Sequence, residues 1–168
     1  MIVMDEDDCM VAMAQFYLGF TVEESCGKCS PCRIGNKRLF EILNKITSGK
    51  GTEEDLRKLR DLGQVIKDTS LCGLGQTSPN PVLSTLDNFY DEYVAHVTEQ
   101  RCPAHQCRDL TVYYINPKKC TGCTLCAHVC PVHAIVGERK ATHIIDPNIC
   151  IRCGSCLEKC RFGAIYVY

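Results

Sequence analysis

Apolar residues recur at helical spacing through the first hundred residues of the chain. Residues 10–20 are mostly apolar, which predicts a buried helix from about Cys9 to about Thr21, and the acidic residues Asp5 to Asp8 ahead of it suit a helix N-terminus. Three more helices are predicted, each with one apolar face: Arg33 to Ile46, Thr52 to about Lys67, and Asn80 to about Thr98. Their apolar positions are Leu39, Ile42, Leu43 and Ile46; Leu56, Leu59, Leu62 and Ile66; and Val82, Leu86, Phe89, Tyr93 and Val97.

Short breaks separate these predicted helices. Ser48 to Gly51 ends the second, and Thr52 with Asp55 forms a start like a capping box for the third. Asn80 and Pro81 supply an N-cap and a proline at the first helical position of the fourth. Because helices with such short connections pack as antiparallel neighbours, this region is predicted to form a four-helix bundle.

The pattern changes in the last third of the chain, where short apolar pairs alternate with cysteine-rich turns. Tyr114-Ile115 and Ile144-Ile145 each precede a cysteine run, and Ala134-Ile135 and Ala164-Ile165 follow the two runs at the same offset. An internal repeat of this kind predicts two similar halves, each a strand, a cysteine turn, a short helix and a strand.

Both cysteine runs read C-x2-C-x2-C-x3-C, the spacing that holds two 4Fe–4S clusters in bacterial ferredoxins, where the fourth cysteine of each run binds the other cluster. Structural zinc sites instead use well-separated C-x2-C pairs, so the spacing favours iron and sulfide. Residues 109–168 therefore resemble a two-cluster bacterial-type ferredoxin, with one departure at Arg161, where the family has proline. The predicted ligand sets are Cys120, Cys123, Cys126 and Cys160, and Cys150, Cys153, Cys156 and Cys130.

A third run, Cys26, Cys29 and Cys32, has no fourth cysteine three residues later. At 1.5 Å per residue, the predicted second helix leads about 20 Å away from this loop and the third returns about as far. Cys72 is therefore expected beside the loop, as the fourth ligand of a third 4Fe–4S cluster. The alternative is that Cys72 is a small buried thiol, but the glycines that flank it suit a backbone bent around a cluster.

The residues around this third set resemble a known family. The segments ESCGKCSPCRIG (24–35) and TSLCGLG (69–75) are similar to the cluster domain of the NADH-binding flavoprotein subunit of respiratory complex I, and of related hydrogenase and formate dehydrogenase subunits. With a ferredoxin behind this domain, the chain resembles the diaphorase, or beta, subunit of multimeric electron-bifurcating FeFe-hydrogenases. In that family an FMN- and NAD-binding domain comes first. No glycine-rich nucleotide loop occurs here, so we expect a fragment, with FMN and NAD(P) bound outside it.

The resemblance implies electron transfer through three 4Fe–4S clusters between a flavin site and partner subunits. The implied partners are a catalytic subunit, a small thioredoxin-like 2Fe–2S subunit and soluble ferredoxin. Nothing in the sequence indicates an acid–base or nucleophilic site, so this part of the subunit is expected only to conduct electrons. The full subunit is expected to be an enzyme. The same role in an NAD-linked formate dehydrogenase is one alternative. A zinc-stabilised interaction module, whose metals are only structural, is an alternative of another class.

Three cysteines remain after the three clusters: Cys9, Cys102 and Cys107. The predicted helix directions place Cys9 and His96 at the end of the bundle opposite Cys72. Three thiolates and one imidazole form a tetrahedral zinc site, so we predict zinc bound by Cys9, His96, Cys102 and Cys107. His105 is the second choice for the imidazole. It lies between Cys102 and Cys107 in the sequence, and three ligands so close together would crowd the metal.

The remaining histidines and two cations are weaker signals. His128, His133 and His143 are interpreted as packing or surface residues that tune the cluster potential through hydrogen bonds. Lys28 and Arg33 flank the third cluster run. They form either a solvated basic face or a surface that stabilises the cluster charge and docks the flavin domain.

Composition agrees with this interpretation. Fifteen cysteines in 168 residues would suit a secreted disulfide scaffold, but the number is odd, the N-terminus has no apolar signal segment, and the spacings are metal spacings. Thiolates need a reducing compartment, so the chain is expected in the cytoplasm. A formal charge of −1 gives no indication of nucleic-acid binding, and no apolar stretch approaches the roughly 18 residues of a membrane span. The predicted fold class is α+β, with a helical bundle (1–100), a linker (101–108) and a ferredoxin domain (109–168).

Overall fold

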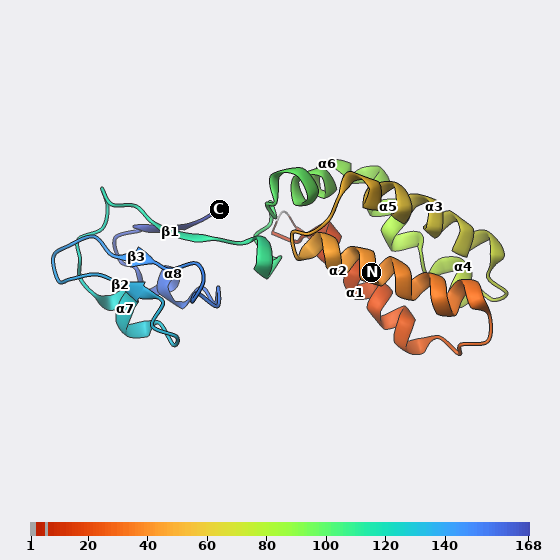
Figure 1. Cartoon of the computed structure of the whole chain (residues 1–168), viewed down its shortest axis with the longest axis horizontal. Coiled ribbons are helices and arrows are strands. Elements are labelled where there is room, and N and C mark those ends of the chain that lie inside the picture. The colour runs from red at the N-terminus through yellow and green to blue at the C-terminus, as the bar shows by residue number, and fades with distance from the viewer. Residues whose placement is uncertain (1–2, 6) are drawn as a thin grey trace. The chain divides into compact units, whose positions relative to one another are not determined.

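The computed structural model describes residues 3–5 and 7–168. The chain divides into two compact units, the first ending at Leu110 and the second spanning Thr111–Tyr168 (Figure 1). Residues 101–108, expected as a linker, lie within the first unit, where Cys102 and Cys107 are buried in the hydrophobic core.

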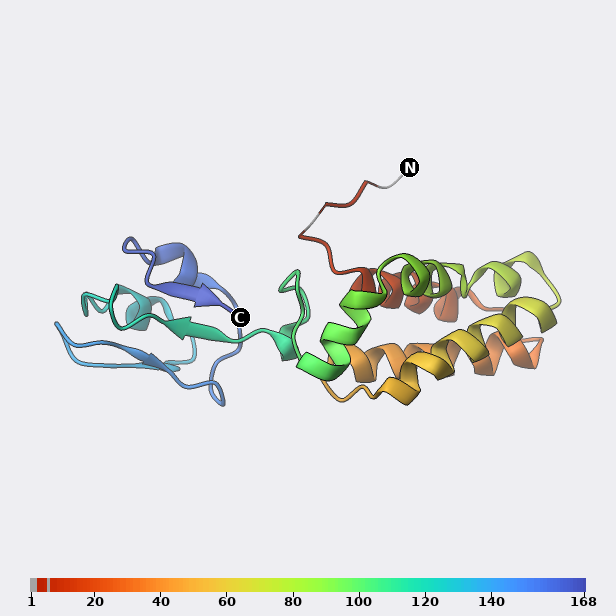
Figure 2. The ribbon, with the colours of Figure 1, turned by 90° about the horizontal axis from the view of Figure 1, so that it is seen from above.

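The first unit is helical. Helix α1 packs against α2 and α5, and α3 packs against the same two helices, so these four helices enclose one core (Figures 1 and 2). Its α-helices are α1 (Met10–Glu24), α2 (Asn36–Thr47), α3 (Glu53–Thr69), α4 (Gly73–Thr77), α5 (Asn80–Asn88) and α6 (Tyr90–Val94). Two π-helical turns, η1 (Pro31–Gly35) and η2 (Ala95–Glu99), and a 3-10 turn, η3 (Arg108–Leu110), complete it.

The predicted apolar faces of the second and third helices are confirmed. Leu39, Leu43 and Ile46 of α2 and Leu59 and Ile66 of α3 are fully buried. The predicted start of the third helix is also confirmed, because Thr52 and Asp55 form a complete capping box at the head of α3. Local polar signals and apolar periodicity agree here, so the sequence alone locates both helices.

The prediction of one continuous fourth helix is wrong. The backbone leaves the helical region at Phe89 (φ −131°, ψ 38°), and the segment divides into α5, α6 and η2. The predicted apolar face of the fourth helix is therefore interrupted at Phe89. Phe89 is 45% exposed, whereas Tyr93 is buried and its hydroxyl lies 2.8 Å from that of Thr85.

The first helix also differs from its prediction. Only one face of α1 meets α2 and α5, so Phe16 and Phe20 remain exposed and the helix is not wholly buried. The first turn of α1 contains no acidic residue. The Met10 backbone N–H instead donates to the Glu92 carboxylate, which lies 82 residues later in the chain. Glu6, part of the predicted acidic run, lies outside the described residues.

The second unit repeats one pattern twice, as predicted. The first half contains β1 (Tyr113–Ile115), α7 (Leu125–Val129) and β2 (Ile135–Val136). The second contains β3 (Ile144–Ile145), α8 (Ser155–Lys159) and β4 (Ile165–Val167). Strand β1 pairs antiparallel with β4, with Tyr114 opposite Tyr166, and β2 pairs antiparallel with β3. Each two-stranded sheet therefore takes one strand from each half, so the halves fold around each other (Figure 1).

Corresponding hydrogen bonds show how closely the halves match. Asn116 donates its backbone N–H to the carbonyl of Ala164 at 2.7 Å, and Asp146 donates to the carbonyl of Ala134 at 2.8 Å. The turn that contains Arg161 has the same hydrogen bond as its counterpart in the first half. Gly163 N–H donates to the carbonyl of Cys160 at 3.2 Å, and His133 N–H donates to the carbonyl of Cys130 at 3.3 Å. Arg161 therefore keeps the turn that proline forms in the first half.

We expect a shortened polypeptide of residues 109–168 to bind two 4Fe–4S clusters without the helical unit. The physical reason is that its eight candidate ligands and both of its sheets lie within Thr111–Tyr168. Iron and sulfide analysis after anaerobic reconstitution measures this, with the full chain as the control. A shortened chain that stays without iron, under conditions that load the full chain, would contradict the prediction.

Within the part of the chain that the structure describes, no helix combines the length and the apolar character needed to cross a lipid bilayer.

Candidate metal centres

Two cavities in the second unit are each walled by four cysteines. The first is lined by Cys120, Cys123, Cys126 and Cys160. The second is lined by Cys130, Cys150, Cys153 and Cys156. In each cavity three cysteines come from one run and the fourth from the other, because α7 and α8 pack against each other. The structure thus brings together both predicted ligand sets.

The electrostatics of these cavities suit a bound cationic core. Burial, together with the negative charge of Cys150, raises the pKa of the Cys156 thiol to about 11. Burial also raises the pKa of Cys126, and the charges of Cys120 and Cys123 add to this. Because neighbouring thiolates repel one another, four of them are stable together only around positive charge.

Backbone N–H groups donate to one cysteine of each cavity. Ala134 donates to Cys130 Sγ at 3.2 Å, and Ala164 donates to Cys160 Sγ at 3.3 Å. Such bonds offset thiolate charge and are one of the means by which proteins set cluster potentials. The donor set and the cavities therefore fit two 4Fe–4S clusters with four thiolate ligands each.

The third cysteine set lies at the loop between α1 and α2. Cys32 is part of the π-helical turn η1, and such turns often occur at functional sites. The backbone N–H of Leu71 lowers the pKa of the Cys29 thiol, which places the segment before Cys72 against the loop. A Cβ at Gly75 would lie 2.6 Å from the Ser70 side chain and 3.1 Å from Cys32 Cβ, so only glycine permits this approach.

Cys72 itself is exposed, which contradicts the alternative that it is a buried packing thiol. Cys26 is exposed as well, whereas Cys32 is buried and Cys29 is intermediate. Arg33, one of the two flanking cations, donates to the carbonyl of Gly27 at 3.1 Å and so braces the loop. The loop and the Cys72 segment lie at one end of the helices (Figures 1 and 2). Their role as ligands of one cluster stays a prediction.

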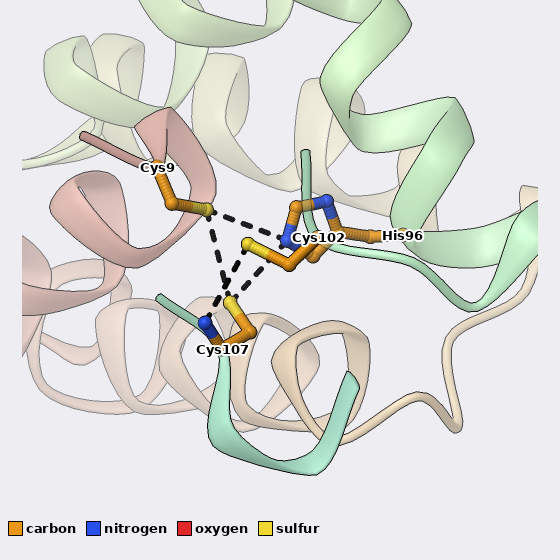
Figure 3. A group of neighbouring side chains, drawn as sticks. All are labelled: Cys9, His96, Cys102 and Cys107. Atoms are coloured by element: carbon orange, nitrogen blue, oxygen red, sulfur yellow. Dashed lines mark hydrogen bonds between the residues drawn. The ribbon is translucent and has the colours of Figure 1, made fainter. Parts of the chain in front are cut away.

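The remaining cysteines meet in the buried part of the first unit. One ligand atom from each of Cys9, His96, Cys102 and Cys107 lies within 4.8 Å of the others, and all four residues are buried (Figure 3). Cys9 comes from the start of α1, His96 from η2, and the other two from the segment that follows. His105, the second choice for the imidazole, is exposed and outside this group.

The distances among three of the four ligand atoms match a tetrahedral zinc site. Zinc–sulfur bonds of about 2.3 Å and zinc–nitrogen bonds of about 2.0–2.1 Å place tetrahedral ligands about 3.8 Å apart for two sulfurs and about 3.5 Å for sulfur and nitrogen. Cys9 Sγ and Cys107 Sγ are 3.7 Å apart. His96 Nε2 lies 3.4 Å from Cys9 Sγ and 3.3 Å from Cys107 Sγ.

A second contact orients the imidazole. His96 Nδ1 lies 2.7 Å from the carbonyl oxygen of Glu92, which can only accept, so Nδ1 donates and Nε2 faces the sulfurs. This pairing with a backbone carbonyl is typical of metal-binding histidines. Glu92 was not predicted as part of the site. Its carboxylate also binds the first N–H of α1, so one residue supports both Cys9 and His96.

The protonation of the four side chains is strongly coupled. Burial alone lowers the pKa of His96, but hydrogen bonds to Cys102 and Cys9 and the charge of Cys9 outweigh it and raise that pKa to about 10. Hydrogen bonds with Cys107 and Cys9 lower the pKa of Cys102, whereas hydrogen bonds with Cys102 and Cys9 raise the pKa of Cys107. The group therefore concentrates negative charge on sulfur in the protein interior, where a divalent cation compensates it best.

Comparison with known families decides the relationship of the chain. Residues 12–96, just over half of it, match the model of the NADH-ubiquinone oxidoreductase-F iron-sulfur binding region. The chain belongs to this family. Residues 119–165 match a second model, the 4Fe-4S dicluster domain. Both descriptions name iron–sulfur binding, so the predicted 4Fe–4S chemistry of the two units is confirmed at that level.

Individual relatives agree with the family. The NADP-reducing hydrogenase subunit HndC of Solidesulfovibrio fructosivorans is 61% identical over 98% of this chain, which covers 34% of that protein. The NADP(+)-dependent formate dehydrogenase subunit beta of Moorella thermoacetica is 38% identical over 55% of this chain and 13% of its own length. A crystal structure of an NAD+-reducing NiFe hydrogenase in the H2-reduced state superimposes on 57% of this chain and 16% of its own, with a TM-score of 0.55 and 31% identity.

These matches confirm the resemblance to the complex I-like subunits of NAD- and NADP-reducing hydrogenases, with a ferredoxin domain behind the iron–sulfur binding region. The chain spans about a third of the length of the hydrogenase subunit that it matches.

Proposed function

We propose that the chain conducts electrons through three 4Fe–4S clusters within a multimeric, electron-bifurcating hydrogenase. The observation that carries this proposal is the pair of cavities in Thr111–Tyr168, each walled by cysteines from both runs. When bound, the clusters supply one-electron redox chemistry. The chain's own residues hold them, and backbone N–H groups donate to the sulfurs of Cys130 and Cys160. No residue of the chain has a catalytic role of its own in this proposal.

The path in this proposal begins at the loop of Cys26, Cys29 and Cys32. Cys26 and Cys72 are exposed, so a flavin site can approach them closely. In this proposal that flavin exchanges electrons with NAD(P)H and is bound outside these 168 residues. The ferredoxin unit then serves the catalytic subunit, a small thioredoxin-like 2Fe–2S subunit or soluble ferredoxin. Its cysteines Cys123 and Cys153 are exposed, so both of its clusters lie near the surface. The cysteine-rich chemistry suits the cytoplasm, where thiolates persist.

The group of Cys9, His96, Cys102 and Cys107 has a different role in this proposal. It binds one zinc ion, which has no redox chemistry and serves as a structural link. Zinc there would join the start of α1 to the segment after η2, two parts of the chain that are distant in sequence. The ferredoxin unit follows that segment directly, at Thr111.

Two alternatives remain from the sequence. Identity of 61% over 98% of the chain favours a hydrogenase complex over a formate dehydrogenase, whose subunit matches over 55%. A module with only structural zinc is disfavoured by the two family matches, because both describe iron–sulfur binding. Assays of the native complex for hydrogen and formate oxidation distinguish a hydrogenase from a formate dehydrogenase. A brown protein, the colour of iron–sulfur clusters, would exclude the zinc-only module.

The third cluster is tested by Cys72→Ala. Anaerobically prepared native protein is expected to contain about twelve irons, from three clusters of four, and the variant about eight. The reason is that Cys72 supplies the ligand that the run Cys26, Cys29 and Cys32 lacks. Ser70→Ala, close to the same loop but without a thiol, is the matched control and should keep the native iron content. Native protein with about eight irons, unchanged in Cys72→Ala, would remove this cluster from the proposal.

A further inference from the structure

A buried amide lies against one sulfur of the third cysteine set. Asn36 is the first residue of α2 and is 0% exposed. Its side-chain Nδ2 lies 3.4 Å from Cys32 Sγ, one helical turn earlier in the chain, and donates to it. The Asn36 backbone N–H donates to the Cys32 carbonyl, so the amide belongs to the same turn as the thiol. Cys32 is 4% exposed, whereas Cys26 and Cys72 are exposed.

Ser78 holds the other end of this amide. A sulfur bound to iron carries no proton and only accepts hydrogen bonds, so the amide nitrogen must face Cys32 and the amide oxygen must face Ser78. The Ser78 hydroxyl lies 2.8 Å from Asn36 Oδ1 and donates to it. Ser78 is buried and directly follows α4, the short helix that begins after Cys72. The bond therefore links the two stretches of chain that supply the four cysteines.

A second neutral donor reaches the same sulfur from the segment before the loop. Ser25 Oγ lies 3.4 Å from Cys32 Sγ. The backbone N–H of Gly27 donates to that hydroxyl at 3.3 Å, which leaves the hydroxyl proton for the sulfur. Amide and hydroxyl groups donate without any change of protonation. Cys32 Sγ is therefore contacted by two side-chain donors, and neither depends on pH.

The family match supports a cluster beside these donors. The matched iron-sulfur binding region covers residues 12–96, and only four cysteines fall in that range: Cys26, Cys29, Cys32 and Cys72. Four thiolates are the usual ligand set of a 4Fe–4S cluster. Cys32 is the buried member of this set. A hydrogen bond to its sulfur is screened least by solvent, so its electrostatic effect is largest there.

We propose that Asn36, oriented by Ser78, is a positioning residue that raises the reduction potential of the 4Fe–4S cluster of Cys26, Cys29, Cys32 and Cys72 by donating Nδ2–H to Cys32 Sγ. This inference rests on the proposed function. Reduction adds one electron to the cluster, and the ligand sulfurs become stronger acceptors. A donor fixed at one of them therefore stabilises the reduced state more than the oxidised state.

The consequence is that side-chain identity sets the potential at the start of the proposed electron path. Cys130 and Cys160 in the second unit accept from the backbone N–H groups of Ala134 and Ala164, and a backbone donor is present with any side chain at its position. The amide of Asn36, by contrast, is removed by a single substitution. The cluster beside it accepts an electron from the flavin more readily than the same cluster without the amide.

Redox titration of the full chain, prepared anaerobically and followed by electron paramagnetic resonance, tests this inference. The couple that is lost in Cys72→Ala identifies the cluster. Asn36→Leu is expected to lower that couple by about a tenfold change in its reduction equilibrium, or 59 mV for one electron, with iron content unchanged. Ser78→Ala frees the amide oxygen and should lower the same couple by less. Asn44→Leu, the same exchange at an exposed position of α2, is the matched control and should change no couple.

The opposite results are equally distinct. An unchanged couple in an Asn36→Leu protein with native iron content would show that the amide does not act on the potential. An equal shift in Asn44→Leu would show a general effect of apolar substitution on α2. If Asn36→Leu loses iron, Ser78→Ala decides: a lowered couple supports the inference, and iron loss or an unchanged couple makes Asn36 structural. A Cys72→Ala protein that keeps all its iron and every couple would instead remove the third cluster from the proposed function.

Discussion

Replacing Cys120 and Cys160 together is expected to remove one 4Fe–4S cluster, about four irons per chain, and no more than either single replacement removes. The two residues belong to different cysteine runs but line the same cavity. If both bind one cluster, the second substitution acts on a site that is already lost. Such non-additivity is the signature of residues that serve one site.

The matched control takes two cysteines from one run. Cys120 and Cys130 lie in different cavities, so their joint replacement by alanine should remove two clusters, about eight irons. Iron and sulfide analysis of anaerobically purified protein measures both double variants beside the three single ones. A pairing of ligands within each run would reverse the two results, with about eight irons lost from the Cys120 and Cys160 variant.

Replacing Cys107 by serine is expected to abolish zinc binding and to destabilise the first unit by several kcal/mol, because structural zinc contributes about 10–16 kcal/mol of apparent binding free energy in small zinc domains. The residue is buried, and its sulfur lies within 3.7 Å of Cys9 Sγ. Without the zinc ion, no bond links the start of α1 to His96 and Cys102 in this buried group. Iron content should not change, since none of these four residues lines either cluster cavity or belongs to the third cysteine run.

Zinc analysis and thermal unfolding measure this effect together. Cys9→Ser should behave like the Cys107 variant, although it lies 98 residues away in sequence. His105→Ala is the matched control, because that histidine stands between Cys102 and Cys107 but lies outside the buried group, and it should keep both zinc and stability. Native protein with only trace zinc, or a Cys9→Ser protein that retains it, would contradict the site.

Local chemistry explains what could be predicted without coordinates. The spacing of the two C-x2-C-x2-C-x3-C runs follows from the geometry of a cluster and one helical turn, so the crossed sets of four cysteines are readable from the chain. The apolar periods of α2 and α3 and the capping box at Thr52 are also local signals. The zinc group was predicted from residues left over and from helix directions, and the structure brings those four side chains together.

Tertiary packing decided the rest. The break at Phe89 has no glycine or proline to indicate it, and the exposed face of α1 reflects which neighbours the helix has rather than its composition. The support that Glu92 gives to the site depends on its bond to Met10, 82 residues away in sequence. The choice of His96 over His105 depends on its contact with Cys9, 87 residues away. The sequence by itself therefore determined which residues can bind metal, because ligand chemistry is carried by residue type and spacing. Only the tertiary structure decided which side chains surround those ligands, because these contacts join residues whose separation along the chain carries no signal.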